Sequence, residues 1–539
     1  MKKFFTLVVM AMTSLAMMAK DYTCPLVVSL SGLDFPPIEG VTVSVDEQIN
    51  GKYTLKLLNF DMGGAMPVGN IVVEDVDAVT CGTTIVLSAQ KNITITEGDK
   101  ELGEDQSWLG PKLGIVPINM QGELKGDKFN AILNIDMSKM AMNIGVKLGD
   151  DWSLMGQIPN SGFETYHKAT VGDVSSDEPN AWHSFMSSTG GLSNMVNKTA
   201  HTFISDEVRP GSTGSHSVKV TSGIVVTDLG FMKINTPANG TITTGRLNAG
   251  SMTAKDEANN SFLDMSTTDV DGNGDPFYAV LTNRPDSIVA WVKFKQGTLD
   301  NKYKDSKYAT ISAIITDGTK YQDPEDPKTT YANVVAKAKN ATIESKDFAW
   351  QRIVVPFDYE TYKANNANPK AILVTMSTNA TPGAASKDEA NPDVLYVDDV
   401  ELIYNCDIKS LKFKGTEMLM EDGGYETEYN GDVNLDDIEV EATSPNAFIN
   451  KSLLDQSDDK EKLTMATITV VSNDLKNANV YYFSIKGASI TGIKKTETVK
   501  NNTVSAIYNA NGQRVSNMNQ PGLYIIKNAD GKTVKFLKK

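Results

Sequence analysis

Alternation of apolar and polar residues, broken at short intervals by turn residues, is the feature that most constrains this chain of 539 residues. Beyond its amino-terminal stretch the chain is rich in Val, Ile, Thr and Tyr, and Gly, Asn and Asp punctuate it. A period of two places every second side chain on one face of a strand, so the pattern predicts strands joined by tight turns. One short stretch, "TYANVVAKAKNA" (330–341), has helical spacing and is expected to form a helix. The chain is otherwise predicted to be all-β.

Length and turn signals divide the chain into several domains. A single core stops growing near ~250–300 residues, so about three or four domains are expected. The first unit has sequential hairpins, such as the one around Asn50-Gly51, and predicts an up-and-down β-barrel. The predicted units are a barrel (22–150), a larger β-rich unit (158–405), a small sandwich (406–487), a polar linker (488–503) and a short β-rich tail (504–539).

The amino-terminal stretch "MKKFFTLVVMAMTSLAMMAKDYTC" predicts a signal peptide over residues 1–19. Lys2 and Lys3 precede an apolar core, and small residues follow it, with cleavage expected after Ala16 or Ala19. The apolar run is shorter than the ~20 residues that a membrane span needs. We therefore expect an exported protein with no transmembrane segment in the mature chain.

The net charge narrows the classes of molecule that the chain could bind. The chain has 67 acidic and 51 basic residues and a net charge of −16, which argues against nucleic acid as a partner because proteins that bind it need a basic face.

Of the three cysteines, Cys24 and Cys81 lie in one predicted domain, and a disulfide between them would leave Cys406 free. A Cys24–Cys81 disulfide and three buried free thiols are both consistent with this spacing.

The first unit resembles the calycin-like domain of exported bacterial proteins. The resemblance rests on "YTCPLVVSLSG", "LKLLNFDMGGAMPVGNIVVEDV" and "GELKGDKFNAILNID". Calycins are similar to lipocalins and often enclose a small apolar ligand, so such a ligand is expected from the resemblance. A barrel filled by its own side chains is the alternative, because eight strands leave little spare room.

The second unit resembles jelly-roll carbohydrate-binding modules at its two ends, "NSGFE" and "YVDDVEL". Its length and interior stretches, among them "EPNAWHSF", "SIVAWVKFK" and "FAWQRIVVPFDY", are similar to a relative called the putative carbohydrate metabolism domain. The resemblance implies that the two ends lie side by side and that a structural Ca²⁺ is bound by Glu164 and Asp398, with Asp399 beside them. Carboxylates capped by backbone N–H groups or by a nearby Lys are the alternative.

A weaker calcium candidate is the loop "TTDVDGNGDPFY". Asp269, Asp271 and Asn273 take positions one, three and five of an EF-hand-like loop, and Asp275 follows Gly274. Val280 stands at position twelve instead of a bidentate Glu, so a solvated turn is favoured over a metal site.

Trp182 and Trp291 are the candidate ligand-binding residues. A flat aromatic face covers a sugar ring, but packing inside the sandwich is the more common role for each side chain. In "SIVAWVKFK", Trp291 lies opposite the aliphatic face formed by Ile288, Ala290, Val292 and Phe294.

The third unit resembles immunoglobulin-like or cadherin-like spacers, and the tail resembles the type IX secretion C-terminal sorting signal. The tail carries "NGQRV" (Asn511 to Val515) and "GLY" (Gly522 to Tyr524). The resemblance implies that secretion machinery binds the tail and that the protein is secreted or held at the outer-membrane cell surface.

No catalytic constellation is apparent in the chain. The four histidines, His167, His183, His201 and His216, lack the surroundings of known metal or triad motifs and are expected at the surface. We therefore predict a non-catalytic protein that binds a carbohydrate or glycoconjugate. A glycan-processing enzyme with its site in the jelly roll, and an adhesion or scaffold protein without a small ligand, are the alternatives.

Overall fold

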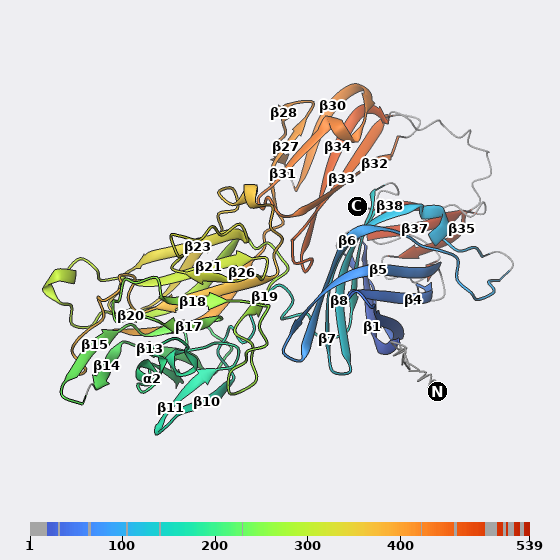
Figure 1. The fold of residues 1–539 in the computed structure, drawn as a ribbon. Coiled ribbons are helices and arrows are strands. Elements are labelled where there is room, and N and C mark those ends of the chain that lie inside the picture. Colours follow the sequence, from blue (N-terminus) through green and yellow to red (C-terminus); the bar gives the residue numbers. More distant parts are fainter. Residues whose placement is uncertain are drawn as a thin grey trace, which may run out of the picture.

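The computed structural model describes residues 19–490, apart from 31–32, 63–65, 104–105, 139–141, 229, 422 and 458–460, together with four strands within 504–538. Strands dominate the described residues, and the two α-helices among them, α1 (Gly110–Leu113) and α2 (Ser193–Val196), have four residues each (Figure 1). The all-β prediction is therefore confirmed. The predicted signal peptide lies outside the described residues, except for its last position.

The first unit is a closed antiparallel barrel of eight strands. The order is β1-β3-β4-β5-β6-β7-β8-β9, β1 pairs with β9 to close it, and β2 (Leu33–Asp34) forms a small hairpin with β1. Alternate side chains point inward and form one core, in which the rings of Tyr22 and Phe129 lie 5.8 Å apart. The strands are β1 (Lys20–Leu30), β3 (Ile38–Glu47), β4 (Tyr53–Asp61), β5 (Pro67–Cys81), β6 (Thr84–Thr94), β7 (Ile115–Lys125), β8 (Lys128–Met137) and β9 (Met142–Leu148).

The second unit packs two sheets against each other. The first sheet has the order β12-β13-β26-β20-β24, and the second has the order β16-β25-β21-β23, with β19 beside β25. The strands of the first sheet are β12 (Thr202–Ser205), β13 (Ser217–Thr221), β26 (Val394–Ile403), β20 (Ser287–Lys295) and β24 (Trp350–Pro356). Those of the second are β16 (Thr241–Thr243), β25 (Ala371–Ser377), β21 (Ala309–Thr316), β23 (Val334–Ile343) and β19 (Ala279–Val280). Both sheets contribute to one continuous core.

Smaller elements surround the two sheets of this unit. Two hairpins are formed by β10 (Tyr166–Val171) with β11 (Val174–Pro179) and by β14 (Gly223–Asp228) with β15 (Lys233–Ala238). A three-stranded sheet consists of β17 (Arg246–Ala249), β18 (Asn259–Leu263) and β22 (Tyr321–Asp323).

Two local predictions for the second unit have opposite outcomes. The core face predicted for β20 is confirmed, because Ile288, Ala290, Val292 and Phe294 are at most 1% exposed and Trp291 lies on the other face. The helix predicted at 330–341 is wrong, since this stretch forms most of β23. Its small and β-branched side chains are buried in a strand paired along its length with β21, and this packing outweighs the helical spacing.

The opening stretch of the second unit forms a turn and not a strand. Phe163, at φ +56°, is fully buried, and its ring lies 5.1 Å from that of Trp182. The backbone N–H of Val400 in β26 donates to the carbonyl of Ser161 at 2.9 Å. The two ends of the unit therefore lie side by side as expected, joined by a turn instead of a strand pair.

The third unit is a small sandwich with its own core. One sheet contains β28 (Thr416–Glu417), β27 (Ile408–Phe413) and β31 (Ile438–Ala442). The other contains β29 (Met420–Glu421), β30 (Gly424–Val433), β34 (Ala478–Ile490), β33 (Leu463–Val471) and β32 (Phe448–Asp455).

The tail forms a four-stranded sheet in the order β36 (Arg514–Val515), β35 (Val504–Asn509), β37 (Gly522–Asn528) and β38 (Thr533–Lys538). Residues 511–513 of the sorting motif lie outside the described residues.

All three cysteines are free thiols. Cys24 lies in β1 and Cys81 ends β5, and the second alternative from the sequence, free thiols, describes this structure. Cys24 and Cys406 are buried and Cys81 is partly so, and burial raises the pKa of each thiol.

Asn473, in the turn between β33 and β34, joins the first three units. Its carbonyl accepts hydrogen bonds from Gln121 of the barrel at 3.0 Å and from Asn283 of the jelly roll at 2.9 Å. Its side-chain oxygen also accepts from the backbone N–H of Arg284 at 2.7 Å. A small apolar cluster of Ile132, Met155, Val471 and Leu475 packs between the units.

Among the described residues, no helix has both the length and the apolar character that crossing a membrane requires.

Candidate functional site

The outer face of the first jelly-roll sheet, turned away from the second sheet, carries a row of half-buried side chains. Strand register places one residue from each of the five strands in this row. Neighbouring core residues such as Val220 and Val397 are fully buried, so alternation directs the row residues outward. In order across the sheet, the aromatic–lysine row consists of Phe203, Lys219, Tyr396, Lys293 and Trp350.

The ammonium groups of the row lie against its rings. Lys293 Nζ is 5.5 Å from the Tyr396 ring centre and 4.2 Å from that of Phe348, which precedes β24. Lys219 Nζ is 5.9 Å from the Tyr396 ring, and Trp350 lies edge-on to Tyr396 at 6.3 Å. Cation–π attraction orients both partners, so the row presents ordered rings and donors. Lys293 also forms an ion pair with Glu207.

Trp291 lies next to the aromatic–lysine row, opposite Asp398 on β26 and Arg352 on β24. Its ring is half-buried, and the Arg209 guanidinium lies 5.2 Å from its centre. Trp182 has a different role: it is fully buried, and its indole N–H donates to the Pro159 carbonyl at 3.0 Å. The prediction of a sugar-stacking face at Trp182 is wrong, because this ring is fully buried in the core of the sandwich.

A β-bulge explains the interrupted pattern at Asp398-Asp399. Asp399 has φ +43°, and the register between β20 and β26 shifts at this point. Arg209 donates its backbone N–H to Asp398 Oδ2 at 2.8 Å and its Nε to Asp399 Oδ2 at 2.6 Å. Asp398 Oδ1 is buried and has no hydrogen-bond partner, and burial raises the pKa of this carboxyl to about 6.

Glu164 lies at the loop that follows Arg209. Its carboxylate accepts the backbone N–H groups of Ser215 at 2.9 Å and of His216 at 3.2 Å. This is the backbone-capped arrangement that the sequence leaves open as an alternative to calcium. The unpartnered Asp398 oxygen still suits a hard cation, so the calcium site at Glu164, Asp398 and Asp399 stays a prediction.

The loop around Asp271 does not direct its oxygens to one point as an EF-hand loop would. Asp269 forms an ion pair with Arg246 at 3.1 Å. Asp271 Oδ1 accepts the backbone N–H groups of Asn273 and Asp275, each at 2.8 Å, and Asn273 donates its side-chain N–H to Asp275 Oδ2 at 2.9 Å. These bonds close the turn on itself and turn Asp271 Oδ2 away from the loop, toward two histidines.

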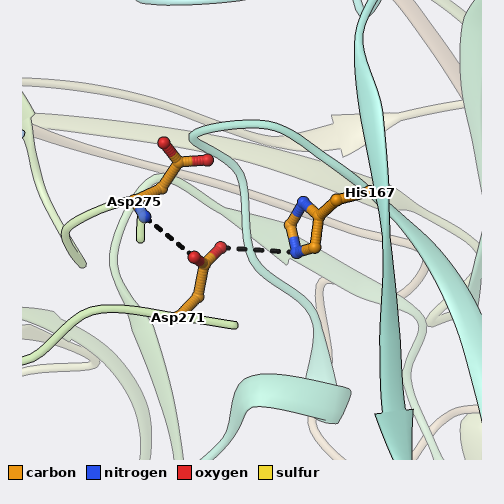
Figure 2. A group of neighbouring side chains, drawn as sticks. All are labelled: His167, Asp271 and Asp275. Carbon is orange, nitrogen blue, oxygen red and sulfur yellow. Dashed lines mark hydrogen bonds and ion pairs between the residues drawn. The ribbon is translucent and has the colours of Figure 1, made fainter. Parts of the chain in front are cut away.

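Four side chains meet at Asp271 Oδ2, and we call them the histidine–carboxylate cluster: His167, Glu178, His183 and Asp271. His167 Nε2 lies 3.5 Å from Asp271 Oδ2 and 3.7 Å from Glu178 Oε2. His183 Nδ1 lies 3.5 Å from Asp271 Oδ2. Figure 2 shows Asp271 between His167, which projects from β10, and Asp275 of its own loop. The side chains of Glu178, His183 and Asp271 are fully buried.

The cluster corrects the expectation that the histidines are surface residues. His183 and His201 are at most 1% exposed, and the side chain of His167 is 11% exposed. One sequence signal for the cluster exists: a turn at Gly172-Asp173 in "HKATVGDVSSDE" places His167 opposite Glu178 across a hairpin. Local patterns contain no signal for the approach of Asp271, which is distant in the chain.

Fold and sites together define a multidomain all-β protein, a calycin-like barrel followed by a jelly-roll domain. Residues 18–149 match the family model of the calycin-like beta-barrel domain, and residues 159–403 match that of the putative carbohydrate metabolism domain. Both domain resemblances seen in the sequence are thereby confirmed. Neither the curated proteins nor the solved structures contain a match to the chain.

Proposed function

We propose that the jelly-roll domain binds a glycan or glycoconjugate, without chemical turnover, on the outer face of its first sheet. The observation that carries this proposal is the aromatic–lysine row. Rings of Phe203, Tyr396 and Trp350 supply apolar faces for sugar C–H groups, and Lys219 and Lys293 supply hydrogen-bond donors for sugar oxygens. The match to a carbohydrate-related family supports the same reading.

The length of the row favours an extended ligand. Phe203, Tyr396 and Trp350 stand on every second strand of the sheet. Neighbouring strands are ~4.8 Å apart, so the row extends ~19 Å across the five strands. Within it the Tyr396 and Trp350 rings lean toward each other, with centres 6.3 Å apart. A glycan chain running across the strands would meet both rings and lysines along its length.

A glycan array probed with the full chain tests the proposal, followed by titration of each glycan bound. Trp350→Ala and Tyr396→Ala should each weaken binding at least tenfold, because each removes a ring from the row. Tyr482→Ala is the matched control, since this exposed tyrosine lies on the third unit. Absence of binding to every glycan, or binding that neither row variant changes, would contradict the proposal.

We also propose that the protein is exported and reaches the cell surface through its tail. The support is the sequence of residues 1–19 and of 504–539. The small apolar ligand of the barrel likewise stays a proposal that rests on the lipocalin-like resemblance.

A further inference from the structure

The histidine–carboxylate cluster contains four buried polar atoms without a hydrogen-bond partner: His167 Nε2, Glu178 Oε2, His183 Nδ1 and Asp271 Oδ2. An unpaired polar atom in a protein interior is costly, and native structures contain few of them. Three separations between these atoms are 3.5, 3.5 and 3.7 Å, and ligand atoms of Glu178, His183 and Asp271 all lie within 4.8 Å of one another. A shared occupant that pairs with all four would remove the cost.

Hydrogen bonds on the far side of the rings define the histidine tautomers. His183 Nε2 lies 3.2 Å from the Pro276 carbonyl, which only accepts, so Nε2 carries the proton and Nδ1 presents a lone pair. His167 Nδ1 lies 3.1 Å from Asn180 Oδ1, which leaves Nε2 with the lone pair. The two lone pairs therefore face carboxylate oxygens, and a cation between them would make the arrangement favourable.

We propose that His167, Glu178, His183 and Asp271 bind one Zn²⁺ ion as a structural site. Zinc prefers four ligands drawn from imidazole, thiolate and carboxylate groups, whereas Ca²⁺ takes six to eight oxygens. The separations of 3.5, 3.5 and 3.7 Å between ligand atoms compare with edges of about 3.3–3.4 Å for a tetrahedron with bonds of ~2.0–2.1 Å. A site with four protein ligands keeps no open position for substrate, so its role is structural.

The groups behind the four ligands hold them in place. Glu178 Oε1 accepts the backbone N–H of Ser184 at 2.8 Å and the hydroxyl of the same residue at 2.5 Å. Asp271 Oδ1 is held by two backbone N–H groups of its own turn, and Asp275 Oδ2 accepts the backbone N–H of Ala181 at 2.9 Å. Each ligand thus uses one atom for the ion and another for a fixed partner, as metal sites in proteins commonly do.

An ion at this position would join segments that are distant in the chain. It would connect both strands of the β10–β11 hairpin to the segment after β11 and to the loop that contains Asp271. The inference concerns the stability of this end of the jelly roll, and it does not depend on the proposed glycan binding.

Metal content and thermal unfolding of the full chain test the inference. The protein is treated with chelator and then loaded with Zn²⁺, Co²⁺ or Ca²⁺ in separate samples. We expect one Zn²⁺ per chain, a rise of the jelly-roll melting temperature by several degrees, and the strong visible absorption of tetrahedral Co²⁺. Glu178→Gln and Asp271→Asn keep the side-chain size and should each weaken Zn²⁺ binding at least tenfold. His216→Gln is the control and should bind as the unchanged protein does, because His216 lies outside the cluster and contacts Asp206.

Chelator-treated protein that unfolds and regains its structure with Zn²⁺ would also support the site. Folded protein without stoichiometric zinc would overturn it, as would zinc binding that is equal in the cluster variants and the control, or octahedral Co²⁺ spectra.

Discussion

His167 and Glu178 are direct partners across the β10–β11 hairpin, and their Nε2 and Oε2 atoms lie 3.7 Å apart. Most other side chains of this hairpin are at least partly exposed, so it has little apolar packing of its own. The cross-strand pair therefore connects the hairpin to the domain through the histidine–carboxylate cluster. A two-stranded hairpin alone is only marginally stable in water, so its order depends on contacts with the domain, of which this pair is one.

Loss of the cluster should loosen the hairpin before the domain unfolds. In Asp271→Asn, backbone amides of 166–179 should exchange with deuterium several-fold faster, while those of β20 should be unchanged, because β20 is paired on both sides by β24 and β26 and has no contact with the cluster loop in the sheet. Hydrogen-exchange mass spectrometry checks this, with His216→Gln as the control. Equal exchange in all three proteins would show that the cluster does not hold the hairpin.

Trp182 and Trp291 of the jelly roll should contribute unequally to its stability. Trp182→Ala should lower the free energy of unfolding by about 3–5 kcal/mol, because it empties a large buried volume. Trp291→Ala should cost only about 1 kcal/mol, the value of a half-exposed cation–π pair with Arg209. Denaturant titration of the jelly-roll transition checks both values. A larger loss in Trp291→Ala than in Trp182→Ala would contradict this assignment of the core.

Calcium should stabilise the protein through Asp398. Its Oδ1 is buried and unpartnered near the loop that caps Glu164, and Ca²⁺ would supply a partner. We expect millimolar Ca²⁺ to raise the melting temperature by a few degrees in the unchanged protein but not in Asp398→Asn. Asp269→Asn, in the other acidic loop, is the control that should keep the response. If Asp398→Asn responds as strongly as the unchanged protein, calcium binds elsewhere.

Asp474 should make the stability of the third unit depend on pH. The side chain is buried, and burial raises its pKa above the ordinary 3.8 despite a hydrogen bond from Ser472. The folded state therefore binds this proton more tightly than the unfolded state, so ionisation of Asp474 destabilises the fold above its raised pKa. The cost disappears as the pH falls through the raised pKa toward 3.8.

The variant Asp474→Asn should therefore melt a few degrees higher than the unchanged protein at pH 7, and the difference should vanish near pH 4. Asn retains an oxygen that accepts the Ser472 hydroxyl, which makes the substitution conservative. Thermal melts between pH 4 and 7 check the trend. A variant that is less stable than the unchanged protein across this range would show that the carboxylate stabilises the unit.

Deletion of residues 504–539 should leave the upstream domains folded but retained in the periplasm. The tail forms its own four-stranded sheet, so its removal takes no strand from the other units. Cell fractionation and surface labelling of the truncated and full chains check the prediction. Normal surface levels of the truncated protein would make the tail a structural element only.

Local sequence patterns determined the class of fold, the order of units and the faces of individual strands. Ile288, Ala290, Val292 and Phe294 occupy every second position of their segment, and these four side chains form the buried face of β20. Such patterns depend only on the geometry of one strand, in which successive side chains point to opposite sides. They also carried the two domain resemblances, which the family models confirm.

Contacts between distant segments determined the features that local sequence patterns did not predict. Trp182 is buried because Phe163 and the sandwich core enclose it, and 334–341 is a strand because β21 pairs with it. The histidine–carboxylate cluster depends on a hairpin turn that aligns His167 with Glu178 and on a second loop that brings in Asp271. Side-chain periodicity tells which way a residue points from its own strand. It contains no information on which loops meet, because that depends on how separate elements pack around a common core.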